Sequence, residues 1–183
     1  KLGIQSVEDM DELELELLER LYEDVLMEHL PNRALTADDL KTWHRRWLGN
    51  VFDWAGQERS VNMGKDGFMF AASAQIPRLL ADFERTCLAR WTPCHGMDTD
   101  ALVEAIAITH VEFILIHPFR EGNGRLSRLL ADVLSVQSGR EPLDYSTWNA
   151  DKPAYIQAIH QGVQMEYAPM KRLVAQALGV GAA

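Results

Sequence analysis

The segment HPFREGNGRLSR, residues 117–128, combines one histidine, one glutamate, two glycines around an asparagine, and three arginines. Apolar patterns of helical period border it on both sides. Pro118 disfavours a helical conformation for His117, so the preceding helix is expected to end there. A new helix is expected to open at Arg125, where leucines recur at helical spacing. The segment therefore predicts a short polar loop between two core helices.

This loop has the composition of an anion-binding site. The glycines on either side of Asn123 are expected to adopt positive φ and turn backbone N–H groups inward, next to the positive end of the following helix. Arg125 and Arg128 are three residues apart, so they are expected to point to the same side. Two guanidinium groups suit a polyphosphate better than a single carboxylate. The predicted phosphate ligands are Gly122, Asn123 through its amide, Gly124, Arg125 and Arg128.

Two further side chains of the segment predict chemistry at that phosphate. Glu121 is a candidate Mg²⁺ ligand, because Mg²⁺ in proteins takes one or two carboxylates and completes its shell with phosphate oxygens and water. His117 is a candidate general base, since its ordinary pKa of about 6.5 suits removal of a proton from an attacking hydroxyl. Phosphoryl and nucleotidyl transfer depend mainly on positioning and charge stabilisation, and these residues supply both.

Outside this segment the pattern is almost entirely helical. The run RSVNMGKDGFMF, residues 59–70, is the exception, and predicts a hairpin around Gly64-Lys65-Asp66-Gly67. An isolated hairpin is marginally stable, so this one is expected to act as a flap against another part of the chain. Acidic residues from Glu8 to Glu19 predict a solvated helix face. The capping signals SVED at Ser6 and TADD at Thr36 predict the starts of the first two helices. Helices are predicted over residues 6–30, 36–49, 73–88, 98–116, 125–139, 153–160 and 169–178.

Composition limits the classes of function. The 183 residues are 47% apolar and predict a single domain, residues 1–183. A net charge of −9 opposes an extended nucleic-acid-binding surface. The most apolar stretch, residues 101–116, is shorter than the roughly 20 residues of a membrane span. Cys87 and Cys94 have neither zinc nor redox spacing. With no signal peptide visible, the cytoplasm is the expected location.

The segment HPFREGNGRLSR resembles the signature of the Fic family, HxFx(D/E)GNGRxxR, at every defined position. The stretch VFDWAGQERSVNMGKDGFMFA, residues 51–71, is similar to the segment that leads into the flap of that family. The helical order from KLGIQSVEDMDELE to EYAPMKRLV is similar to that of small bacterial Fic proteins. The resemblance implies an all-α Fic-type domain with one β-hairpin flap beside the active site. It also implies an Mg²⁺-dependent protein adenylyltransferase that moves AMP from ATP to a Ser, Thr or Tyr hydroxyl.

The resemblance assigns a role to each motif position. His117 would deprotonate the target hydroxyl, Phe119 would anchor the loop in the core, and Glu121 would bind Mg²⁺. The hairpin, around residues 60–71, would pair with an extended segment of the target protein. Residues assigned to the α- and β-phosphates are Gly122, Asn123 and Gly124, and those assigned to the outer phosphates are Arg125 and Arg128.

Several alternatives stay open at this point. Gly124 favours AMP transfer, because the kinase-like Doc branch has lysine there, yet transfer of UMP or of a phosphoryl group is not excluded. A nucleotide-binding helical module without turnover is the alternative from another class. No glutamate follows Ser or Thr by four residues, so the inhibitory motif (S/T)xxxE(G/N) is absent, which resembles the toxin branch restrained by a separate antitoxin chain. A helical HD phosphohydrolase is strongly disfavoured, because the sequence contains no adjacent His-Asp dipeptide.

The remaining histidines and the tryptophans are predicted to be structural. No motif surrounds the histidines, and no basic stripe accompanies the tryptophans that precede the hairpin. Arg120 falls at a variable motif position and receives no role. The residues predicted to be structural are His29, His44, His95, His110, His160, Trp43, Trp47 and Trp54.

Overall fold

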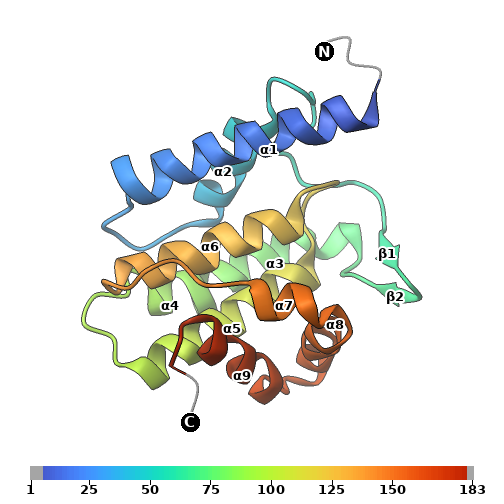
Figure 1. Ribbon diagram of the computed structural model, residues 1–183. Helices are drawn as coiled ribbons and strands as arrows, with labels where there is room; N and C mark the ends of the chain where they lie inside the picture. Colours follow the sequence, from blue (N-terminus) through green and yellow to red (C-terminus); the bar gives the residue numbers. More distant parts are fainter. Residues whose placement is uncertain (1–5, 181–183) are drawn as a thin grey trace.

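A computed structural model describes residues 6–180, and it is helical apart from one two-stranded hairpin (Figure 1). This confirms the predicted all-α class with a single hairpin. The predicted domain span and the similarity that begins at Lys1 also include residues 1–5 and 181–183, which lie outside the described range. The helices are α1 (Val7–Glu23), α2 (Ala37–Leu48), α3 (Ile76–Phe83), α4 (Ala89–Trp91), α5 (Thr99–Ile116), α6 (Asn123–Gln137), α7 (Ser146–Ala150), α8 (Lys152–Gln161) and α9 (Ala168–Ala177).

Shorter helical turns extend some of these elements. Wider π-helical turns at Asp24–Glu28 and Glu84–Leu88 continue α1 and α3. Single 3-10 turns at Ser73–Gln75 and Gly162–Gln164 precede α3 and follow α8. Strands β1 (Gly64–Lys65) and β2 (Phe68–Met69) make an antiparallel pair that projects from the helical body (Figure 1).

Helix α5 is the centre of the molecule, with α3, α6, α8 and α9 packed around it. Its apolar residues cover nearly all sides, as expected of a helix surrounded by others. Asp98 starts it by accepting a hydrogen bond from the backbone N–H of Ala101 at 2.8 Å. Because α6 follows α5 directly and packs along it, the loop between them is fixed at one end of the core. Within residues 6–180, no helix has both the length and the apolarity needed to cross a membrane.

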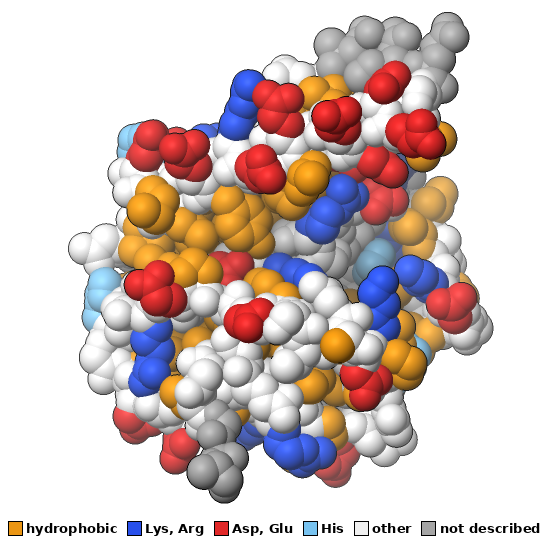
Figure 2. Space-filling view, in the orientation of Figure 1, with side chains coloured by type: hydrophobic (Ala, Val, Ile, Leu, Met, Phe, Trp, Pro, Cys, Tyr) orange, Lys and Arg blue, Asp and Glu red, His pale blue; other side chains and the backbone are white. Residues whose placement is uncertain are grey.

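Helices α1 and α2 form a layer over α6 (Figure 1). Both begin at predicted caps: Ser6 accepts a hydrogen bond from Asp9, and Thr36 and Asp39 form a reciprocal capping box. Acidic side chains line the outer side of α1, and apolar side chains gather between α1 and the body below it (Figure 2). Trp47 of α2 is fully buried, as predicted.

The structure corrects the predicted boundaries at two places. Helix α6 begins at Asn123 rather than Arg125, because Gly122 already supplies the left-handed residue that precedes the helix, with φ of 80°. The hairpin turn consists of Asp66 and Gly67 alone, both with positive φ, as a tight two-residue turn requires. Helix α7 was not predicted, since five residues are too few to show a helical period.

Candidate functional site

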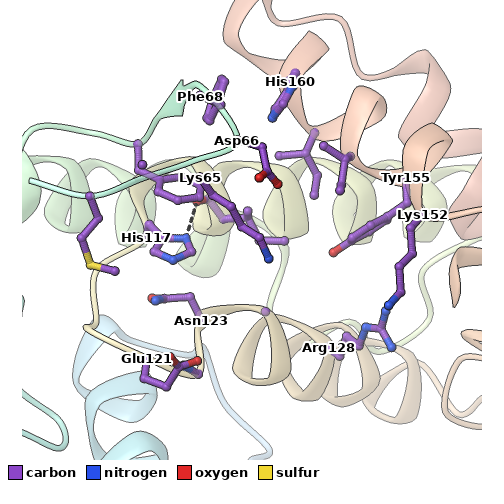
Figure 3. Close-up of a pocket in the computed structure, with 18 of the residues that line it drawn as sticks. Lys65, Asp66, Phe68, His117, Glu121, Asn123, Arg128, Lys152, Tyr155 and His160 are labelled. Carbon is purple, nitrogen blue, oxygen red and sulfur yellow. Dashed lines mark hydrogen bonds between the residues drawn. The ribbon is translucent and has the colours of Figure 1, made fainter.

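His117 ends α5 in a left-handed conformation, with φ of 51° and ψ of 60°. Its ring stacks on Phe70 at a centroid distance of 3.7 Å, and Nδ1 lies 3.3 Å from the carbonyl oxygen of Ile114. A carbonyl can only accept, so this contact places the proton on Nδ1 and leaves the lone pair on Nε2. Burial lowers the pKa of His117 to about 4. The ring is therefore neutral at neutral pH and lines a cavity (Figure 3).

The loop after His117 is held by its own side chains. Phe119 is buried in the core, and Asn123 bonds to both sides of its backbone. Asn123 Oδ1 accepts from the Phe119 N–H at 2.9 Å, and Nδ2 donates to the Phe119 carbonyl at 2.8 Å. These two bonds orient the amide but use only one of its two N–H donors. Donation from the second N–H, or from the backbone N–H of Asn123, to a phosphate stays a prediction.

His44 supports the same loop from α2. Its ring stacks on Phe119 at 4.0 Å, Nδ1 accepts from the Gly56 N–H at 2.8 Å, and Nε2 donates to the carbonyl of Glu121 at 3.0 Å. Burial lowers the pKa of His44 to about 4, so the ring is neutral. His44 is structural, as predicted. Its bond to the loop could not be read from the sequence, because 77 residues separate His44 from Glu121.

The two glycines of the loop serve different purposes. Gly122 has φ of 80°, and a Cβ atom on it would lie 2.6 Å from the ring of Trp47. Gly124 lies inside α6, and a Cβ atom there would meet nothing within 4 Å. The prediction of positive φ is right for Gly122 and wrong for Gly124. The bare backbone at Gly124 instead leaves the first turn of α6 open to the cavity.

Replacing Gly122 by alanine is expected to destabilise the fold by about 2–4 kcal/mol, since it adds left-handed strain and a clash with Trp47. Urea unfolding followed by circular dichroism measures this change. Gly124→Ala is the matched control, and its expected effect is neutral or slightly stabilising, because alanine favours a helix and has room there. Equal stability of the two variants would contradict the assignment.

Arg125 and Arg128 border one small cavity of about 300 Å³, together with Gly124 and Tyr155. The two arginine side chains thus border the same space, as predicted, but each contacts different residues of the chain. Arg125 lies over the Trp47 ring and forms ion pairs with Glu14 at 2.8 Å and Glu121 at 3.4 Å. Arg128 also borders the larger cavity next to His117. It lies over Tyr145, and its side chain donates to Asn149 at 3.0 Å.

Glu14 is the site residue that the sequence prediction placed wrongly. It was assigned to a solvated acidic face, yet it is 6% exposed and its carboxylate holds Arg125. The Trp47 indole N–H donates to the Glu14 carbonyl at 2.8 Å, which fixes the same turn of α1. A signal was present: Glu14 stands in helical register with Met10 and Leu21, on the apolar side of α1.

The larger cavity has a volume of about 490 Å³ and lies between the hairpin, the loop, α6 and α8. In Figure 3, Lys65 and Asp66 reach over it from the hairpin, while Arg128, Lys152 and Tyr155 stand on the opposite side. His160 stacks on Phe68 at 4.0 Å, so the predicted structural histidine closes the cavity by joining α8 to the hairpin. Arg120, which received no role, also lines this space.

One buried histidine lies behind the cavity wall. His110 is 1% exposed, as predicted for a core residue, and its Nε2 is 2.8 Å from the hydroxyl of Tyr155. Burial lowers the pKa of His110 to about 3, so it is a neutral partner. This bond orients Tyr155, whose ring forms part of the cavity wall.

Glu121 has the surroundings expected of a metal ligand beside a phosphate. Its side chain is 60% exposed, it lines both cavities, and one oxygen accepts from the Gly122 N–H at 3.0 Å. A single partly exposed carboxylate next to a phosphate-sized space fits the preference of Mg²⁺ for few protein ligands. The residues present are therefore compatible with Mg²⁺.

Comparison with known proteins points to one family. Residues 34–135 match the Fic/DOC family. The chain is 33% identical over 102 residues to the protein adenylyltransferase VbhT of Bartonella schoenbuchensis, which covers 56% of this chain. It is 27% identical over 165 residues to the probable protein adenylyltransferase y4lH of Sinorhizobium fredii, which covers 90% of this chain and 84% of that protein.

Solved structures show the same fold. The N-terminal FIC domain of Bep8 from Bartonella sp. 1-1C superposes with a TM-score of 0.81 at 22% identity, over 97% of this chain and 88% of that one. An N-terminal Fic domain from Bartonella quintana with bound ADP gives a TM-score of 0.79 at 25% identity, over the same shares. The chain spans 21% of the length of VbhT and 27% of the adenylyltransferase fic-1 of Caenorhabditis briggsae.

Proposed function

The chain belongs to the Fic/DOC family, and from this premise we propose that it transfers AMP from ATP to a hydroxyl group of a target protein. One observation carries the proposal. The neutral ring of His117 lines a cavity that also contains the glycine turn, the open start of α6 and Arg128. Relatives named as protein adenylyltransferases and a related Fic domain with bound ADP support a nucleotide in this space.

In the proposed reaction, the oxygen of a Ser, Thr or Tyr side chain attacks the α-phosphorus of ATP. The new oxygen–phosphorus bond forms while the bond between the α-phosphorus and the oxygen bridging to the β-phosphorus breaks, and pyrophosphate leaves. Nε2 of His117 accepts the proton of the attacking hydroxyl. Backbone N–H groups at the start of α6, with Arg125 and Arg128, are placed to stabilise the phosphate charges. Glu121 would hold Mg²⁺, which neutralises phosphate charge when bound.

The hairpin is the proposed docking site for the target. Each strand pairs on one side only, so its other edge offers free backbone groups for an added strand. Val61 and Met69 are 52% and 63% exposed and lie on this segment, where they can contact a partner. A strand added here would run past Phe70, which stacks on His117.

A separate restraining chain is part of the proposal. Arg128 forms no ion pair with any carboxylate in the described part of the chain, whereas Arg125 is held by the buried Glu14. Within residues 6–180, the side chain of Arg128 contacts Asn149 and aromatic rings, and no carboxylate of the chain occupies it. Co-expression with a candidate antitoxin that restores growth of a producing strain would support this part.

The pH dependence of AMP transfer tests the role of His117. A base whose pKa is lowered stays unprotonated to lower pH, so activity is available above about 4 and is lost as the pH falls through that value. From pH 7 to 5.5, kcat/KM is expected to change less than about twofold, whereas an unshifted imidazole would lose about tenfold. Initial rates over this range, with circular dichroism at each pH, check the expectation. A steep loss below pH 6.5 in a folded protein would contradict it.

Labelled nucleotides test the function directly. Incubation with α-labelled ATP and Mg²⁺ in bacterial lysate is expected to label a protein band, while γ-labelled ATP gives none. Label from the γ-position would indicate phosphoryl transfer, and label only from α-labelled UTP would indicate UMP transfer. Nucleotide binding with no label from any of the three would favour a binding module without turnover.

A further inference from the structure

Arg59 is a buried cation in the segment between α2 and β1, and its exposure is only 2%. The guanidinium donates to four backbone carbonyls: those of His117 and Val61 at 2.6 Å each, Ala71 at 2.6 Å and Ile116 at 3.2 Å. The backbone N–H of Arg59 donates in addition to the carbonyl of Pro118 at 2.8 Å. One side chain therefore contacts both ends of the hairpin segment and the end of α5.

The buried charge of Arg59 requires hydrogen-bond acceptors around the guanidinium. A guanidinium is always protonated and carries five N–H donors, and a buried charge without compensating bonds is strongly destabilising. Within residues 6–180 it forms no ion pair, so carbonyl oxygens alone compensate for its lost hydration. These oxygens belong to segments that must come together for the charge to be satisfied. Burial of Arg59 thus links the position of the hairpin to that of His117.

The hairpin itself supplies little rigidity. Two residue pairs and one further bond, from the Phe70 N–H to the Met63 carbonyl at 3.1 Å, connect its two arms, and such a hairpin is marginal without outside support. Its ties to neighbouring parts include two ring stacks, Phe70 on His117 and Phe68 on His160. They also include a backbone bond from Ala71 to Leu115 at 3.1 Å and a bond from the Ser73 N–H to the Asn62 side chain at 2.8 Å. Arg59 is the described residue that bonds to both ends of the hairpin and to the His117 carbonyl at once.

We propose that Arg59 is a positioning residue, which holds the hairpin and the imidazole of His117 in one fixed relation so that a docked target hydroxyl lies next to Nε2. The role rests on the proposed function, because it concerns the same attack. Arg59 does not touch the cavity, so it acts through the backbone of His117 and of the hairpin. We call these hydrogen bonds of the Arg59 side chain the clamp. Loss of the clamp misplaces the attacking hydroxyl without removing a contact to the nucleotide.

The test compares Arg59→Met with the wild type in three measurements. Hydrogen exchange of the amides of residues 60–71 is expected to accelerate about tenfold or more, because the opening of the hairpin becomes easier. The Kd for ATP is expected to stay within about threefold, since the nucleotide contacts are unchanged. With labelled ATP and a target, kcat is expected to fall about 100-fold, the scale of a misplacement of about 1 Å.

Val174→Ala is the matched control, because Val174 is fully buried in α9 and does not line the cavity. This variant removes core packing and is expected to lower the stability of the whole fold. Its hairpin exchange and its kcat are expected to stay close to those of the wild type. Arg59→Lys keeps the charge but cannot reach four carbonyls at once, so its hairpin exchange should lie between wild type and Arg59→Met. If Arg59→Met does not fold, Arg59→Lys carries the test alone.

Wild-type hairpin exchange in a folded Arg59 variant would overturn the proposal, as would an equal loss of kcat in Val174→Ala at matched stability. The exchange measurement needs no turnover, so it separates this proposal from the proposed function. If the wild type transfers no group from ATP, the proposed function fails while the clamp is still measured. If the wild type transfers AMP and the hairpin of Arg59→Met stays protected, only the clamp fails.

Discussion

His117→Asn is expected to lower AMP transfer about 100- to 10,000-fold, the usual contribution of a general base. Asparagine has no group that can accept the hydroxyl proton at neutral pH. It is the better replacement for this position because it tolerates the left-handed backbone that His117 adopts, with φ of 51°. His117→Ala removes the same base but adds backbone strain of about 1 kcal/mol. The rate is measured as label transferred from α-labelled ATP to a target at saturating nucleotide.

The loss should be confined to the chemical step. The Kd for ATP is expected to stay near that of the wild type, because His117 contributes a proton acceptor and not a phosphate ligand. His95→Asn serves as the control, since His95 is exposed and, among the residues that the structure describes, bonds to the side chain of Asn32 alone. Retained transfer by His117→Asn, or an equal loss in His95→Asn, would remove His117 from the mechanism.

Arg128→Ala is expected to weaken ATP binding about 30- to 100-fold, which corresponds to about 2–3 kcal/mol for a charge-assisted contact with phosphate. Arg128 borders both cavities and forms no ion pair within residues 6–180, so its charge is available to a ligand. Stability should change little, because the described contacts of its side chain are with Asn149 and with the rings of Tyr145, Trp148 and Tyr155, and none is an ion pair. Equilibrium binding of a fluorescent ATP analogue, with thermal unfolding alongside, gives both quantities.

Arg125→Ala is the informative comparison for Arg128→Ala. Arg125 neutralises the buried Glu14, so its removal leaves a carboxylate without its partner and is expected to cost about 1–3 kcal/mol of stability. The two variants should therefore differ: Arg128→Ala mainly loses affinity for ATP, and Arg125→Ala mainly loses stability. Arg128→Lys, which keeps the charge, should recover part of the affinity. Unchanged ATP binding in Arg128→Ala would show that the phosphates lie elsewhere.

The sequence alone was enough for the local features of this protein. The polar loop between two core helices, the helix caps at Ser6 and Thr36, and the hairpin around residues 64–67 depend on dihedral preferences and on hydrogen bonds over a few residues. The same reasoning put His117 at a helix end beside a glycine turn. These features could be predicted because their partners are close together along the chain.

The tertiary structure decided which distant residues hold the site. His44 supports the loop from 77 residues away, Arg59 contacts His117 from 58 residues away, and Glu14 pairs with Arg125 across 111 residues. A periodic pattern tells which face of a helix is buried, but not which residue of another helix lies against that face. It also could not show that the amide of Asn123 bonds to its own loop, or that only one of the two glycines has positive φ. Those outcomes depend on how α1, α2 and the hairpin pack around the start of α6, and packing is set by all of these elements together.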